Sequence, residues 1–193
     1  MILALDASGA AGSVALVEDD ETVREIAVET PRGRGGALFA ALEEILSGAG
    51  PLERVVVGIG PGSYNGIRSA IAVAWGIAQA RQIPLVGLSS LLGLDEGDYS
   101  AVGDARRGQF YLAAIRDGKF VREPELLEQA ELLQQLEPGR IYVPEALEIL
   151  PQATVRAPDA TRLARLGRRL EPAQAGLEPL YLKPAHITKS SRP

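Results

Sequence analysis

The sequence predicts an α/β protein whose two halves repeat one order of elements: three strands, a helix, a strand, a helix and a strand. Short apolar runs typical of buried strands alternate with segments whose apolar residues recur at helical spacing. This order occurs twice along 193 residues, a length that suits one large domain or two small ones. A repeated order constrains the fold to a duplicated βββαβαβ arrangement in two lobes.

The first lobe is expected to span residues 1–92 and to begin with three strands separated by turns. Gly48 and Gly50 end the helix that follows those strands, and a second helix comes after the fourth strand. The predicted elements are strands at 2–6, 13–17 and 23–28, a helix at 38–46, a strand at 54–59, a helix at 66–82 and a strand at 84–87.

The second lobe is expected to span residues 98–193, after an acidic, glycine-containing break at 92–97. Asp117-Gly118 predicts a tight hairpin between its second and third strands. The predicted elements are strands at 99–104, 109–115 and 119–122, a helix at 126–136, a strand at 140–143, a short helix at 145–150, a strand at 153–156 and a helix at 161–170.

A glycine-rich loop, Gly58-Ile-Gly-Pro-Gly-Ser-Tyr-Asn-Gly-Ile-Arg68, lies between a predicted strand and a predicted helix. Backbone N–H groups converge in such a place, so the loop favours an anion site and a tight turn equally. It lacks the lysine of a phosphate-binding Walker A loop and the third glycine of a dinucleotide-binding turn. It also has proline where a nucleophile elbow needs glycine two residues before the serine. Gly62 is expected to need a positive φ or close backbone contact.

The loop resembles the GPGSFTGLR signature of the TsaB family, also called YeaZ. Three other stretches agree with that family in order and rough spacing: Ile2-Leu-Ala-Leu-Asp-Ala-Ser8, Asp104-Ala-Arg-Arg-Gly-Gln-Phe-Tyr111 and Pro179-Leu-Tyr-Leu-Lys183. The resemblance therefore spans almost the whole chain. The chain departs from the family pattern at Ala7, at Tyr64-Asn65 and at Ile67-Arg68-Ser69.

The resemblance implies the two-lobed actin, sugar-kinase and Hsp70 architecture, which is related to RNase H. In active members of that superfamily, carboxylates at the end of the first strand of each half face nucleotide phosphates and their metal, and Asp6 and Asp104 occupy these places. The candidate residues for binding a nucleotide in the cleft are Asp6, Ser8, Gly60, Gly62, Ser63 and Asp104. No resident cofactor is expected, and ATP or ADP with magnesium is expected only in complex with partners.

Composition argues against catalysis by the chain alone. The single histidine, His186, lies in a polar tail and there is no cysteine, so neither a zinc site nor a Ser-His-Asp triad is expected. A net charge of −5 argues against a large basic nucleic-acid surface, and the arginines at 162–169 are interpreted as a solvated helix face. No run approaches the roughly 20 apolar residues of a membrane span, and the start lacks a charged signal-peptide region. The cytoplasm is the expected location.

Residues 70–78 contain no polar side chain over more than two helical turns, whereas a surface helix ordinarily keeps a polar face. Two interpretations remain open: the neighbouring helix at 38–46 covers this segment, or both helices form an apolar patch for a partner. Ile67, Ile71, Ala74 and Ala78 are assigned to the core. The candidate interface residues are Leu38, Leu42, Arg68, Ala72, Trp75 and Gln79.

The favoured function is a non-catalytic scaffold in the machinery that forms threonylcarbamoyladenosine beside the tRNA anticodon. The resemblance implies a TsaD-like transferase as partner, a TsaE-like ATPase as third member, indirect contact with tRNA, and a homodimer when the chain is alone. One alternative is an ATP-dependent carbamoyl or phosphoryl transferase that uses Asp6 and Asp104. Another is a stand-alone nucleotide-binding module.

Overall fold

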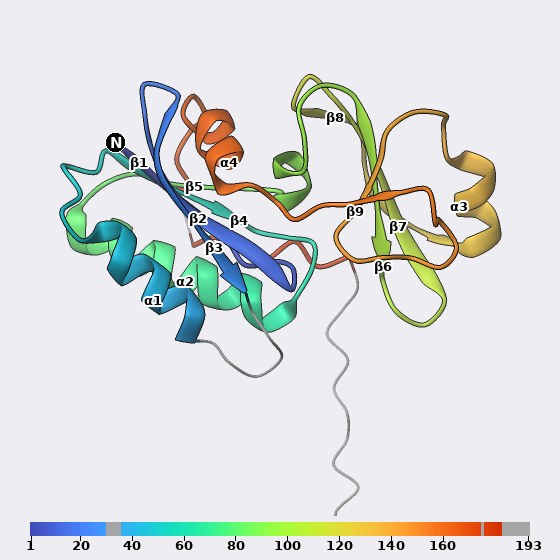
Figure 1. Ribbon diagram of the computed structural model, residues 1–193, viewed down its shortest axis with the longest axis horizontal. Coiled ribbons are helices and arrows are strands. Elements are labelled where there is room, and N and C mark those ends of the chain that lie inside the picture. The colour runs from blue at the N-terminus through green and yellow to red at the C-terminus, as the bar shows by residue number, and fades with distance from the viewer. Residues whose placement is uncertain (30–35, 175, 183–193) are drawn as a thin grey trace, which may run out of the picture.

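The computed structural model describes residues 1–29, 36–174 and 176–182 and places them in two lobes (Figure 1). Each lobe contains a mixed five-stranded sheet, one with the order β3-β2-β1-β4-β5 and the other with the order β10-β9-β6-β7-β8. The two sheets have the same strand order when one is read from β3 and the other from β8. In each sheet three consecutive strands pair antiparallel, and the later strands add in parallel beside the first of the three, β1 or β6. The predicted duplicated, actin-like α/β fold is confirmed.

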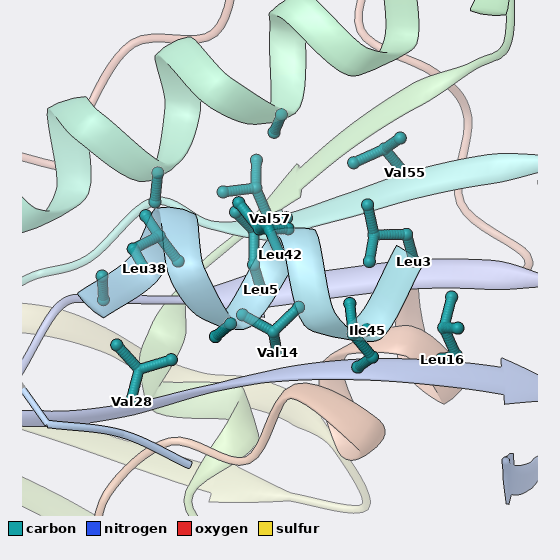
Figure 2. Close-up of a cluster of buried hydrophobic side chains, with 14 of the residues drawn as sticks. Leu3, Leu5, Val14, Leu16, Val28, Leu38, Leu42, Ile45, Val55 and Val57 are labelled. Carbon is teal, nitrogen blue, oxygen red and sulfur yellow. The ribbon is translucent and has the colours of Figure 1, made fainter. Parts of the chain in front are cut away.

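The first sheet holds the strands that lead into the glycine-rich loop. Its elements are β1 (Ile2–Asp6), β2 (Ala11–Glu18), β3 (Glu21–Glu29), α1 (Gly36–Leu46), β4 (Arg54–Gly58), α2 (Tyr64–Arg81) and β5 (Leu85–Leu88). Helices α1 and α2 cover one face of this sheet, and their apolar sides close a core over the central strands (Figure 2). Burial on both faces explains why β1 and β4 read as continuous apolar runs.

The second sheet follows a short connecting helix and repeats the strand order of the first, but residues 144–153 between β9 and β10 form no helix. Its elements are η1 (Ser90–Gly93), β6 (Tyr99–Asp104), β7 (Gln109–Arg116), β8 (Lys119–Glu128), α3 (Gln129–Gln135), β9 (Ile141–Val143), β10 (Thr154–Val155) and α4 (Ala160–Gly167). Asp117 and Gly118 both have positive φ between β7 and β8, which confirms the hairpin predicted there.

Two sequence predictions for the second lobe are wrong. Leu126 pairs with Tyr111, so the residues expected to begin a helix instead extend β8. The short helix expected at 145–150 is not formed. Prolines at 144 and 151 leave only six residues between them, too few to repay helix nucleation, and the apolar side chains of that segment pack into the second-lobe core instead.

Helix α4 lies against the first sheet, although its residues fall within the range 98–193. Ala160, Leu163 and Ala164 are fully buried against the face of the first sheet opposite to α1 and α2. A side chain at Gly167 would lie 2.8 Å from the methyl groups of Val56, so the last turn of α4 sits very close to β4. The first sheet is therefore covered by α1 and α2 on one face and by α4, from late in the chain, on the other.

The segment 176–182, here called the C-terminal strap, also returns to the first lobe. The amide N of Leu180 donates to the carbonyl O of Ile59 at 2.8 Å, and Leu177 packs beside Gly87 of β5. Leu182 packs against the core of the second lobe. The strap thus contacts both lobes and runs past the glycine-rich loop.

Candidate functional site

The glycine-rich loop packs tightly against the end of β1. Gly62 has φ of 155°, and a Cβ atom there would lie 2.1 Å from the carbonyl O of Ser8. The amide N of Ser63 donates to the same carbonyl at 2.6 Å. The Ser63 hydroxyl then accepts from the amide N of Gly66 at 3.3 Å and caps α2. Only glycine permits so close an approach at position 62.

Two serines after β5, Ser89 and Ser90, hold the loop from its other side. The amide N of Gly60 donates to the Ser90 hydroxyl at 3.0 Å, and the amide N of Ser90 donates to the carbonyl O of Gly60 at 2.9 Å. The Ser89 hydroxyl donates to that carbonyl as well, at 2.9 Å. Sequence reasoning missed both residues, although small polar residues directly after a buried strand were the available signal.

Asp6 is completely buried beneath this loop. Its Oδ1 atom accepts from the amide N of Ser8 at 2.8 Å and from the Ser8 hydroxyl at 2.7 Å. Its Oδ2 atom has no hydrogen-bond partner among the described residues. A Cβ atom added at Gly58 would lie only 1.8 Å from this oxygen, so the side chain of Asp6 fills the space beside Gly58. Burial raises the pKa of the Asp6 carboxyl, and the neighbouring Ser90 hydroxyl and the hydrogen bonds from Ser8 only partly offset this effect. The arrangement favours a neutral carboxyl that does not face solvent.

Asp104 lies on the second sheet and is held by its own turn. Its Oδ1 atom accepts from the amide N of Arg106 at 2.6 Å, and its Oδ2 atom lies 3.4 Å from the guanidinium of the same arginine. Arg106, Arg107 and Gly108 all have positive φ, of 67°, 62° and 76°. This side chain is partly exposed, in contrast to Asp6.

The structure therefore brings together most, but not all, of the residues predicted to bind a nucleotide in the cleft. Five of the six gather at one junction at the end of β1, where Asp6, Ser8 and Gly60 are buried and Gly62 and Ser63 are exposed. Their contacts are mostly with one another and with backbone, so the junction fixes the shape of the loop. Asp104 belongs to the other lobe, where its oxygens are engaged by Arg106.

One side of α2 is exposed and carries the predicted outer residues. Arg68, Ala72, Trp75 and Gln79 are exposed, while Ile67, Ala74 and Ala78 are buried against the sheet. Trp75 keeps 52% of its surface accessible. The division of this helix into a core stripe and an outer stripe follows its periodicity.

Helix α1 presents a different surface from the one expected. Leu38 and Leu42 are 3% and 4% exposed and belong to the core, so neither offers a surface to a partner. Their side chains point toward the sheet (Figure 2). Phe39, which sequence reasoning missed, is 57% exposed on the same helix. The available signal was a large apolar residue one position out of step with the helical spacing of Leu38 and Leu42.

The described residues offer neither a metal-ligand cluster nor a membrane-spanning helix. Within residues 1–29, 36–174 and 176–182, no cluster of three or more His, Cys, Asp or Glu side chains is placed to hold a metal ion. In the same ranges, none of the helices has the length and apolar character needed to cross a bilayer.

Comparisons with known proteins agree with the geometry of the fold. Residues 36–161 match the family model described as TsaD, tRNA N6-adenosine threonylcarbamoyltransferase. The chain is 30% identical over 157 residues to the tRNA threonylcarbamoyladenosine biosynthesis protein TsaB of Escherichia coli, a match that covers 70% of this chain and 67% of that protein. It is 31% identical over 138 residues to the protein of the same name from Bacillus subtilis, covering 66% of this chain and 58% of that one.

Two solved structures from Pseudomonas aeruginosa share the fold. An uncharacterized protein with similarity to peptidase YeaZ superimposes with a TM-score of 0.75 at 24% identity, covering 94% of this chain and 99% of that one. A structure described as YeaZ superimposes with a TM-score of 0.65 at 22% identity, covering 86% and 90%.

Proposed function

The chain belongs to the TsaB (YeaZ) family, and from this membership we propose that it takes part in forming threonylcarbamoyladenosine in tRNA. Its role is that of a non-catalytic scaffold that binds and activates a TsaD-like transferase. The names of the relatives from Escherichia coli and Bacillus subtilis support the process, and the surface of the first lobe supports the scaffold role.

The observation that carries the scaffold role is the exposed side of α1 and α2, here called the α1–α2 face. It consists of Phe39, Arg68, Ala72, Trp75 and Gln79. Phe39 and Trp75 are 57% and 52% exposed, although both are large and apolar. Tryptophan anchors interfaces more often than most residues, and small residues such as Ala72 allow helices to approach closely. A partner helix therefore fits this face, and a second copy of the chain is proposed to cover it when no partner is present.

The junction under the glycine-rich loop supports a role without chemistry. A nucleotide phosphate with magnesium needs an accessible, charged carboxylate, but Asp6 is buried, and burial raises its pKa. In this proposal ATP or ADP binds only when the partners complete a site. The TsaE-like ATPase joins the assembly, and tRNA reaches it chiefly through the transferase.

The test is a single substitution on the α1–α2 face. Ala72→Glu places a charge on an exposed position, so the variant should remain folded but should no longer associate with itself or with a TsaD-like transferase. Sedimentation velocity measures the association. The emission of Trp75, the only tryptophan in the chain, should shift to the blue when the parent binds its partner.

Ala130→Glu is the matched control, because Ala130 is an exposed alanine on α3 of the second lobe. It should associate as the parent does. A folded Ala72→Glu variant that still associates normally would place the interface elsewhere. Calorimetric binding of ATP with magnesium by the chain alone would favour the ATP-dependent alternative instead.

A further inference from the structure

Leu92 lies at the boundary between the lobes and packs against the cores of both. It belongs to η1, the short helix that leads from β5 to β6. Its side chain packs against the first-lobe core that contains Val56 and Leu163, and also against the second-lobe core that contains Tyr99. The apolar interiors of the two lobes are therefore continuous through this side chain.

Helix α4 forms another connection, because it contacts both lobes at once. Its inner side is buried on the first sheet. At its start, the amide N of Asp159 donates to the carbonyl O of Gly93 at 3.0 Å, which fastens the helix to η1. Near its end, Leu166 touches the β7–β8 hairpin of the second lobe, since a Cβ atom added at Gly118 would lie 2.9 Å from its Cδ2 atom. One helix is thus packed on the first sheet and against a hairpin of the second.

Charged side chains hold the linker between η1 and β6. Asp95, whose side chain is 16% exposed, pairs with Arg140 at 3.1 Å and with Arg156 at 3.2 Å, and both arginines belong to the second lobe. The next residue, Glu96, lies 3.7 Å from a guanidinium nitrogen of Arg162 on α4. Glu96 is 74% exposed, so this pair contributes little to stability. Asp95 therefore fixes the linker to the second lobe, and the contacts across the boundary are mainly apolar.

We propose that Leu92, α4 and the C-terminal strap lock the two lobes into one rigid body that does not open and close about the linker. Two domains move relative to one another by default, and a large apolar interface prevents that motion. Here the apolar contacts come from separate parts of the chain, since Leu177 of the strap packs on the first-lobe core and Leu182 on the second. A hinge also needs residues that are free to change φ and ψ, whereas Asp95 and the start of α4 hold the linker on both sides.

The inference goes beyond the proposed function and does not depend on it. Kinases and periplasmic binding proteins close their lobes around a ligand by a hinge motion. A chain whose lobes are locked instead holds its second lobe at one position relative to whatever binds the α1–α2 face. Closure around a nucleotide is therefore not expected of this chain.

The experiment measures the distance between the lobes by double electron–electron resonance on the full-length chain. Because the chain has no cysteine, Glu43→Cys on α1 and Gln134→Cys on α3 supply its only spin-label sites, at exposed positions on helices at opposite ends of the molecule (Figure 1). An excess of unlabelled chain suppresses distances between copies. The distribution should show one narrow peak that does not move when ATP with magnesium is added. A broad or two-peaked distribution, or a shift on adding ATP, would overturn the inference.

Truncation of the connecting side chains tests what locks the lobes. The labelled double variant Leu92→Ala, Leu166→Ala removes apolar contacts of η1 and of α4, and it should broaden the distribution. Val121→Ala, at an exposed position of the second lobe, is the matched control and should leave it unchanged. Circular dichroism checks folding, and if the double variant does not fold, the two single variants decide by the same criterion. Folded variants that keep the narrow peak would refute the proposed lock. Association with the transferase is measured separately with Ala72→Glu, so mobile lobes would leave the scaffold proposal intact.

Discussion

Gly62 shows how a single missing Cβ shapes the loop. Because that atom would lie 2.1 Å from the carbonyl O of Ser8, any larger residue must push the loop away from β1. Gly62→Val is expected to lower the free energy of unfolding by about 1–3 kcal/mol through local strain. Urea denaturation of the variant and the parent measures the difference.

Gly76→Ala is the control for this prediction, since Gly76 lies on the exposed side of α2 and a Cβ there meets no atom within 4 Å. It should raise stability by about 0.5–1 kcal/mol, because alanine favours a helix over glycine. If Gly62→Val unfolds at the same urea concentration as the parent, the loop is not the tight turn described above.

The Asp6 carboxyl should make stability depend on pH. Burial raises its pKa in the folded protein above the unfolded value of about 3.9, so the neutral form is favoured by folding. Its contribution to stability is fully present below that unfolded value and is lost as the pH rises through the folded pKa. Asp6→Asn removes the ionisable group but keeps an acceptor for Ser8. Its stability relative to the parent should therefore increase as the pH rises from about 4 toward 8.

Urea denaturation at a series of pH values measures this difference. A constant gap between Asp6→Asn and the parent across the series would show that Asp6 is equally charged in the folded and unfolded states. Sequence reasoning placed Asp6 at a strand end but did not predict its burial. The residue that closes the site, Ser90, lies 84 positions away, and no local pattern links the two.

Among the elements, α2 was predicted well, the helices at 126–136 and 161–170 were predicted with shifted bounds, and the helix at 145–150 does not form. The apolar stripe of α2 recurs over five turns, so its core and outer sides follow from spacing alone. The segment at 145–150 has one turn and a half, where the same apolar residues suit a helix or an irregular chain packed on the core. A short apolar run contains too few repeats for its spacing to distinguish a helix from an irregular segment.

Helix α4 gives the prediction at this scale. Leu163 is fully buried against the first sheet, so Leu163→Ala should lower the free energy of unfolding by about 2–5 kcal/mol. The loss should appear in the fluorescence of Trp75, which lies in the first lobe on the other face of the same sheet. Equilibrium urea unfolding followed by tryptophan emission measures it.

Leu133→Ala on α3 is the comparison, because Leu133 is 49% exposed on the second lobe. It should change stability by no more than about 0.5 kcal/mol. An unchanged Trp75 transition in Leu163→Ala would mean that α4 unfolds separately from the first lobe.

For the whole molecule, the sequence predicted two lobes and their order but not which segments cross between them. The strand order of each sheet follows from the repeated pattern of apolar runs, and both sheets agree with it. The return of α4 and the strap to the first lobe depends on matching surfaces far apart in the chain. Gly167 of α4 against Val56 and Leu180 against Ile59 are contacts of this kind, which leave no periodic signal.

The return of α4 also has a consequence during synthesis on the ribosome. Until residues 160–167 emerge, one apolar face of the first sheet has no helix to cover it, even though all its strands have been made. The first lobe of the nascent chain therefore cannot complete its core until most of the chain has been synthesised. A fragment that ends after β5 leaves that face of the sheet exposed. Chaperones that hold apolar surfaces are expected to engage the chain during this interval.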